Sequence, residues 1–166
     1  MISPPDLPAL RAQIIELAAI PGPAGHEDAI ARHLAGRLAP LADAVTIDAL
    51  ANVTARFGPE TGAPRVAIVA HSDTVGFLVK QVDPAGFLRV VAVGGVNLKA
   101  LPGAAVQVGP HPGVIGVRAQ HLARPGDLTV EVDDLAVAVD PALAPTIAIA
   151  TPVTFAPQAV ALGETM

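Results

Sequence analysis

The residues best suited to chemistry are a histidine and an aspartate at the end of an apolar run. Residues 66–70 are apolar, and His71 and Asp73 follow them directly. Short apolar runs bounded by Pro and Gly predict strands that are buried on both faces. In an α/β sheet, functional side chains gather where such strands end. We therefore expect a site at His71 and Asp73.

This pair has the composition of part of a metal site. Residues two apart in an extended chain point to the same side, so Asp73 could orient His71 or share its site. A metal-bound histidine needs its second ring nitrogen held by a carboxylate or carbonyl oxygen, which fixes the tautomer and raises basicity. A bare His-x-Asp also occurs by chance as a polar turn without chemistry. The surrounding sequence must decide between these interpretations.

The composition of the 166 residues limits the class of protein. The net charge is −5 and no basic run exists, so we expect no nucleic-acid partner. There is no cysteine, so any metal would be held by histidines and carboxylates. The first residues lack the pattern of a signal peptide, and no apolar run is long enough to span a bilayer. We therefore expect a cytoplasmic protein without a membrane partner.

Apolar periodicity in the first half predicts helices and strands of an α/β sheet. Residues 6–19 predict a helix capped by Asp6, and a second helix is expected after the loop at residues 20–27. Strands are expected at residues 44–48, 52–57 and 66–70. This order is typical of a sheet with helical cover.

The second half has a different character, which begins near Gly76. Short strands separated by Gly and Pro turns predict a small barrel or sandwich. The turn at residues 83–86, with Pro second and Gly fourth, predicts a hairpin. We expect strands at residues 77–82, 87–93, 104–108, 113–117, 128–132, 135–139, 146–150 and 152–155, with one helical turn at residues 140–144.

Several short segments resemble, in order, the M42 family of metallo-aminopeptidases, which includes tetrahedral and glutamyl aminopeptidases. They are Ile20-Pro21-Gly22-Pro23-Ala24-Gly25-His26-Glu27, Asp48-Ala49-Leu50-Ala51-Asn52-Val53, Ala70-His71-Ser72-Asp73-Thr74-Val75-Gly76-Phe77, residues 83–89, Gly94-Gly95, Leu101-Pro102-Gly103 and Gly113-Val114-Ile115-Gly116. No single segment is diagnostic, but the ordered set extends over nearly the whole chain.

The resemblance implies a fold class of α/β plus an all-β module. The α/β part would be an incomplete phosphorylase/hydrolase-like zinc-exopeptidase sheet, and the inserted module would be PDZ-like or a barrel and would support dimerisation. We accordingly expect residues 1–76 to be the N-terminal part of the catalytic domain and residues 77–155 to be the dimerisation module. Residues 156–166 would begin the return to the catalytic domain.

The resemblance also implies a function and a site. The family removes N-terminal residues from peptides with two adjacent divalent metals, zinc or cobalt, and forms homo-oligomers. His71 would be a metal ligand, and Asp73 would be the carboxylate of the catalytic centre that supports it. The chain departs from the family at Thr74, where Glu is usual, and at Ser72, where Met is common.

The remaining ligands of the family come after the inserted module and include an Asp-Asp pair followed by Arg and a Glu-Glu pair. Asp133 and Asp134 are followed by Leu135 and lie inside the module, and the sequence contains no Glu-Glu. A two-metal hydrolase needs several ligands and a base, so we expect this chain to be inactive alone. The alternative is a non-catalytic assembly or binding module that works through strand edges or apolar patches.

The other histidines and acidic residues are weaker candidates. We expect His26 and His33 to be surface residues, His111 to be a solvated loop residue, and His121 to lie at a subunit interface. Gly94-Gly95 lacks the strand-to-helix setting of a phosphate loop, so we expect no nucleotide site. The acidic residues near 133 and 140 miss the spacing of a calcium loop, which predicts a solvated edge.

An incomplete catalytic sheet has a physical consequence. The strand at residues 66–70 would lack cover, so we expect Val66, Ile68 and Val69 to be exposed and the chain to associate in solution.

Overall fold

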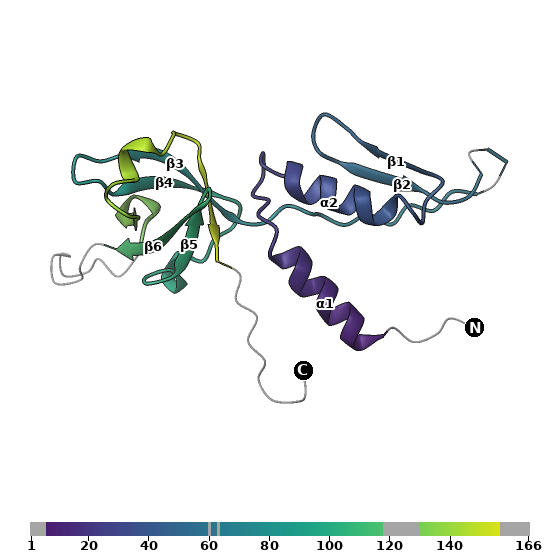
Figure 1. Cartoon of the computed structure of the whole chain (residues 1–166), viewed down its shortest axis with the longest axis horizontal. Helices are drawn as coiled ribbons and strands as arrows, with labels where there is room; N and C mark the ends of the chain where they lie inside the picture. The colour runs from purple at the N-terminus through teal and green to yellow at the C-terminus, as the bar shows by residue number, and fades with distance from the viewer. Residues whose placement is uncertain (1–5, 60, 63, 118–129, 157–166) are drawn as a thin grey trace. The chain divides into compact units, whose positions relative to one another are not determined.

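The computed structural model describes residues 6–59, 61–62, 64–117 and 130–156. The chain divides into two compact units, Met1–Thr74 and Val75–Met166. The first unit holds two helices and a hairpin, and the second holds a barrel (Figure 1). Apart from Ala156, the expected return segment at residues 156–166 lies outside the described residues.

The two helices of the first unit begin and end close to the predicted positions. Helix α1 (Leu7–Ala18) begins after Asp6, whose carboxylate accepts a hydrogen bond from the Ala9 N–H at 3.3 Å, as a helix cap does. Helix α2 (Asp28–Leu38) packs against the hairpin and buries Ile30 and Ala31 (Figure 1). None of the helices in the described residues is long and apolar enough to cross a membrane.

The hairpin pairs β1 (Ala44–Ile47) antiparallel with β2 (Val53–Arg56). Asp48 organises the turn between them: its carboxylate accepts hydrogen bonds from the N–H groups of Leu50 and Asn52 and from the Asn52 amide, each at 2.9 Å. These bonds, the Asn52 side chain first, lower the pKa of Asp48. One of the segments shared with the family resemblance is therefore a turn built by its own polar residues.

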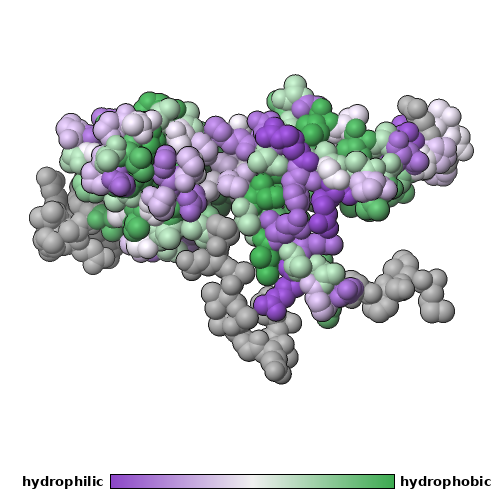
Figure 2. All heavy atoms as spheres, viewed as in Figure 1, coloured by the Kyte–Doolittle hydropathy of each residue, from purple (hydrophilic) through white to green (hydrophobic). Residues whose placement is uncertain are grey.

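The prediction of a strand at residues 66–70 is wrong. The backbone there is assigned to no strand, and Val66, Ile68 and Val69 are 90%, 97% and 88% exposed. A strand needs a hydrogen-bonded neighbour, and the described part of the chain places none beside this segment. The expected exposure of these apolar side chains is confirmed. Hydrophobic residues also reach the surface elsewhere in both units (Figure 2).

The second unit is a closed barrel, one of the two architectures predicted. Its strands follow one another around the barrel in the order β3-β4-β7-β6-β5-β8, and β8 pairs again with β3. All of these pairings are antiparallel. The strands are β3 (Gly76–Val82), β4 (Leu88–Val93), β5 (Ala105–Val108), β6 (His111–Val117), β7 (Leu135–Ala138) and β8 (Pro152–Phe155). Closure leaves these strands without a free edge.

The barrel is filled by medium-sized aliphatic side chains and one phenylalanine. Buried residues alternate with less buried ones along β5 and β7 and at the start of β4, as a pleated strand requires. The fully buried side chains include Phe77, Val79, Leu88, Val90, Val106, Val108, Ile115, Leu135, Val137 and Val153. The Phe77 ring meets the Phe155 ring edge to face, with centroids 6.2 Å apart.

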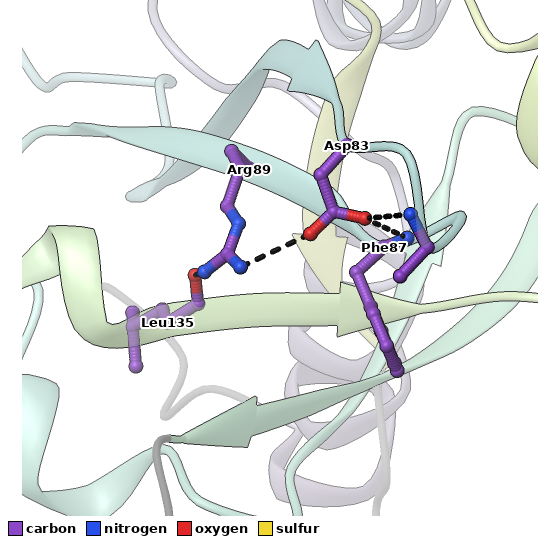
Figure 3. Close-up of polar contacts among 5 residues, drawn as sticks. Asp83, Phe87, Arg89 and Leu135 are labelled. Atoms are coloured by element: carbon purple, nitrogen blue, oxygen red, sulfur yellow. Dashed lines mark hydrogen bonds and ion pairs between the residues drawn. The ribbon is translucent and has the colours of Figure 1, made fainter.

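The predicted turn at residues 83–86 is present between β3 and β4. The Asp83 carboxylate accepts hydrogen bonds from the N–H groups of Ala85 (2.9 Å) and Phe87 (3.0 Å), and its second oxygen contacts the Arg89 guanidinium (Figure 3). Gly86 adopts a φ of +85°, which glycine reaches without strain.

Three details of the second unit differ from the predictions. No strand forms at residues 146–150, where a short 3₁₀ helix (Ala144–Thr146) is followed by a turn with Ala150 at a φ of +67°. The helical turn predicted at residues 140–144 is present: the Asp140 carbonyl oxygen accepts the N–H groups of Leu143 (2.9 Å) and Ala144 (3.3 Å), and the turn leads into this 3₁₀ helix. His111 begins β6 and is not a loop residue.

The third difference concerns residues 128–132. Residues 128 and 129 lie outside the described residues, and residues 130–132 form no strand because Val132 begins a 3₁₀ helix (Val132–Asp134). Glu131 and Asp134 cap this helix reciprocally. His121 lies outside the described residues.

Candidate metal-binding site at His71 and Asp73

His71 and Asp73 face each other at the end of the extended segment. The Nδ1 atom of His71 lies 3.1 Å from the backbone oxygen of Asp73 and 3.3 Å from its carboxylate Oδ1. Both partners are acceptors, so the neutral imidazole carries its proton on Nδ1 and keeps the Nε2 lone pair available. This is the arrangement in which a carboxylate or carbonyl orients a histidine for a metal.

The pair is open to solvent. The His71 side chain is 86% exposed and the Asp73 side chain 48% exposed. An incoming ion or substrate therefore reaches both groups without displacing protein atoms in the first unit.

The backbone beside the pair is held by the loop that precedes α2. The Thr74 N–H donates a hydrogen bond to the Gly22 carbonyl oxygen at 2.7 Å, and Pro23 forms a parallel bridge with Thr74. Gly22 and Pro23 are buried. The loop at residues 20–27 therefore anchors the chain immediately after Asp73.

The donor types fit part of a divalent-metal site. An imidazole with a free Nε2 is a common ligand for zinc and cobalt, and a carboxylate suits the same ions. Within the described ranges, however, no three His, Cys, Asp or Glu side chains gather in a way that could hold a metal ion. His71 and Asp73 therefore offer one imidazole and one carboxylate at this place in the described structure.

The remaining histidines and acidic residues have structural partners or lie apart. In the first unit, Glu16 joins the two helices, with one carboxylate oxygen 3.4 Å from His33 and the other 3.1 Å from Arg37. His26 lies half-buried in the loop, and its backbone N–H donates a hydrogen bond to the Pro23 carbonyl oxygen at 2.8 Å.

In the second unit, Lys80 forms an ion pair with Asp133 and lowers the pKa of that carboxyl, chiefly through the hydrogen bond between them. His111 is half-buried in β6.

Sequence reasoning missed the contact between Gly22 and Thr74. The two residues lie in different segments of the family resemblance, and nothing local in either segment indicates that they meet. Their shared membership in that ordered set was the only available signal.

Comparison with known proteins assigns the family. The model of the M42 glutamyl aminopeptidase family matches residues 51–165. The chain is 37% identical over 142 residues to the putative aminopeptidase SgcX of Escherichia coli K12, and the match covers 78% of this chain and 38% of SgcX.

Two solved peptidases share this fold over a little less than half of their length. The TET aminopeptidase of Thaumarchaeota archaeon SCGC AB-539-E09 superposes with a TM-score of 0.78 at 25% identity, over 93% of this chain and 47% of that one. The TET1 peptidase of Pyrococcus horikoshii, which assembles into a tetrahedron or a large octahedral shell, gives a TM-score of 0.74 at 26% identity, over 88% and 46% of the two chains.

The mixed α/β unit followed by a barrel thus matches the fold of aminopeptidases. The chain belongs to the M42 glutamyl aminopeptidase family. It spans less than half the length of the relatives described above.

Proposed function

We propose that this chain forms part of a metallo-aminopeptidase that removes N-terminal residues from peptides. The observation that carries the proposal is the His71–Asp73 pair, whose Nδ1 contacts at 3.1 Å and 3.3 Å leave Nε2 available for a metal. Family membership supports the reaction class. Divalent metals bound at such a centre, zinc or cobalt in this proposal, would supply Lewis-acid chemistry for hydrolysis of the peptide bond.

In this proposal, each side chain of the pair has a separate task. His71 would hold a metal, because its Nδ1 is engaged by Asp73 and its Nε2 is left available. Asp73 holds the imidazole in the required tautomer through its backbone oxygen and carboxylate. Solvent exposure of both side chains leaves room for further ligands and for a peptide.

We further propose that the chain alone is inactive. A co-catalytic site needs more ligands than one imidazole and one carboxylate, and the described residues assemble no larger set. Turnover would therefore need ligands contributed by further polypeptide of the same fold.

Family membership also supports a role for each part of the chain. We propose that residues 1–76 belong to the catalytic domain, that residues 77–155 form a dimerisation module, and that residues 156–166 begin the return to the catalytic domain. Homo-oligomers would form through the module. The exposed apolar side chains of Phe87, Val91 and Val114 on its surface support this role, and so does the assembly of the TET1 peptidase.

The test combines metal binding with a peptidase assay on the 166-residue chain. Zinc and cobalt would be titrated by calorimetry into the wild type, His71→Ala and His111→Ala, where His111 is a half-buried histidine of the barrel and serves as the matched control. Hydrolysis of leucyl- and glutamyl-anilides would be measured in parallel.

We expect weak metal binding that His71→Ala removes and His111→Ala retains, with no turnover. Binding unaffected by His71→Ala would contradict the ligand role of His71. Turnover by the chain alone would contradict the proposed inactivity and would leave the reaction class standing.

A further inference from the structure

We propose that Gly22 is a positioning residue of the His71–Asp73 site, because it is the point where the loop before α2 holds the backbone that carries the pair. The inference rests on the proposed function for its metal-binding consequence. Its structural part, the clamp on Thr74, stands on the contacts alone.

The clamp is a backbone hydrogen bond that belongs to an isolated parallel bridge. The Gly22 carbonyl oxygen accepts the Thr74 N–H at 2.7 Å, and Pro23 bridges to Thr74 in parallel register. Pro23 is fully buried and Gly22 is buried, so the loop side of the clamp is packed. Thr74 is the residue directly after Asp73.

The clamp matters because the preceding segment has little other support. Residues 64–73 are assigned to no strand or helix in the described structure, and Val66, Ile68 and Val69 are almost fully exposed. The clamp on Thr74 is therefore the backbone anchor next to the pair. Loss of this anchor would free both side chains to separate.

A side chain at position 22 would crowd α2. An added Cβ would lie 3.1 Å from Cγ2 and 3.7 Å from Cβ of Ile30 in α2, and 3.9 Å from the Ser72 backbone oxygen. The first distance is tighter than ordinary contact, and Ile30 is 5% exposed and cannot swing into solvent. A side chain at position 22 would therefore push the loop away from α2 and move the carbonyl that holds Thr74.

The geometry also provides a rescue. Leucine has a single γ carbon, so Ile30→Leu removes the Cγ2 methyl group that an added Cβ at position 22 would meet, while it keeps an apolar side chain of the same size. Gly36 provides the matched control, because an added Cβ there meets no atom within 4 Å.

The experiment uses the full chain and four variants: Gly22→Ala, Gly36→Ala, His71→Ala and the double variant Gly22→Ala/Ile30→Leu. Nuclear magnetic resonance would measure hydrogen exchange of the Thr74 amide and the amide shifts of His71 and Asp73. Calorimetry would measure cobalt affinity, and thermal unfolding would report whether each variant is folded.

We expect Gly22→Ala to speed exchange of the Thr74 amide by about ten-fold or more, to shift the His71 and Asp73 amides, and to weaken His71-dependent cobalt binding by about ten-fold. Gly36→Ala should leave the Thr74 exchange rate, the His71 and Asp73 amide shifts and the cobalt affinity unchanged. The double variant should recover most of the Thr74 protection and of the cobalt affinity, which a general loss of stability would not explain.

Unchanged Thr74 exchange and unchanged His71 and Asp73 shifts in folded Gly22→Ala would overturn the inference. So would a double variant that recovers nothing. If cobalt binding in the wild type does not depend on His71, the proposed function fails at that residue, while the exchange and shift data still decide whether Gly22 positions the pair.

Discussion

The Arg89 guanidinium lies 3.0 Å from the Asp83 carboxylate, and that carboxylate also accepts two N–H groups of the turn between the two residues. The Arg89 guanidinium reaches on to the Leu135 carbonyl oxygen on β7, at 3.5 Å. Strands β4 and β7 share one registered pair, Leu88 with Val137. The Asp83–Arg89 pair therefore joins the hairpin to a neighbour that it contacts sparsely (Figure 3).

Asp83→Ala should lower the midpoint of thermal unfolding more than Arg89→Met does. The first change leaves two turn N–H groups without their acceptor as well as breaking the ion pair, whereas the second breaks only the contacts of the guanidinium. Differential scanning calorimetry of both variants would measure the order. Equal decreases in the unfolding midpoint would contradict the prediction, because they would mean that hydrogen bonds from water replace those from Asp83 without loss of stability.

Acid should weaken the fold partly through Asp83. The hydrogen bond from the Phe87 N–H, with Arg89 and the Ala85 N–H, lowers the pKa of this carboxyl below its ordinary 3.8. A carboxyl with a lowered folded-state pKa stabilises the fold at pH values above 3.8, and that contribution is lost as the pH falls through the folded-state pKa.

The corresponding measurement is urea unfolding of the wild type and Asp83→Asn between about pH 5 and about pH 2. The stability advantage of the wild type should shrink as the pH falls. Because Asp48 and Asp133 remain in both proteins, the difference between them isolates Asp83. An advantage that stays constant over the whole range would contradict the prediction.

Gly86→Ala should destabilise the barrel by about 1–2 kcal/mol, because a residue with a Cβ is strained at a φ of +85°. The space itself is adequate, since the nearest atom to an added Cβ is the Ala144 Cβ at 4.0 Å. Gly86→Asn should cost less, because asparagine tolerates this conformation. Gly95→Ala, with no atom within 4 Å of an added Cβ, is the control in chemical denaturation.

Leu88→Ala should cost roughly 2–5 kcal/mol, since the side chain is fully buried in the barrel and its removal leaves a cavity. Val91→Ala on the same strand, where the side chain is 46% exposed, should change stability by about 0.5 kcal/mol or less. Denaturant unfolding of the two variants would compare them directly. Similar costs would indicate that Leu88 is not a core residue.

The exposed segment at residues 66–69 should make the chain self-associate. Ile68 is 97% exposed, so Ile68→Lys should reduce association without unfolding the protein. Thr54→Lys, at an exposed polar position of β2, changes the net charge equally and should leave association as it is. Sedimentation velocity over a range of concentrations would measure the association state of each variant. A wild type that stays monomeric throughout would contradict the prediction.

Local signals predicted much of this structure. Asp6 capped the expected helix, and the turn at residues 83–86 formed as its Asp, Pro and Gly required. Barrel strands were recognisable because their apolar residues alternate or run between turn residues. In each case the information lies within a few residues of the element that it specifies.

The errors arose where the outcome depends on distant partners. Residues 66–70 have the composition of a buried strand, but a strand exists only with a neighbour. At residues 146–150, Ile147 is buried and Ile149 is 61% exposed, but the backbone turns and reaches β3 at Ala150, whose N–H donates a hydrogen bond to the Val79 carbonyl oxygen. The Gly22–Thr74 clamp likewise joins segments far apart in the sequence, so no pattern around either residue could indicate it.

The pairing of β3 with β8 bears on how the barrel could be inserted into another protein as a domain. Phe77 lies opposite Val153, so the strand that enters the barrel and the strand that leaves it are hydrogen-bonded neighbours. A domain whose two connections emerge side by side can be inserted into a loop of another protein, or removed from it, without forcing the host apart. The barrel therefore has the geometry of a domain that could be inserted into another protein, or removed from it, as a unit.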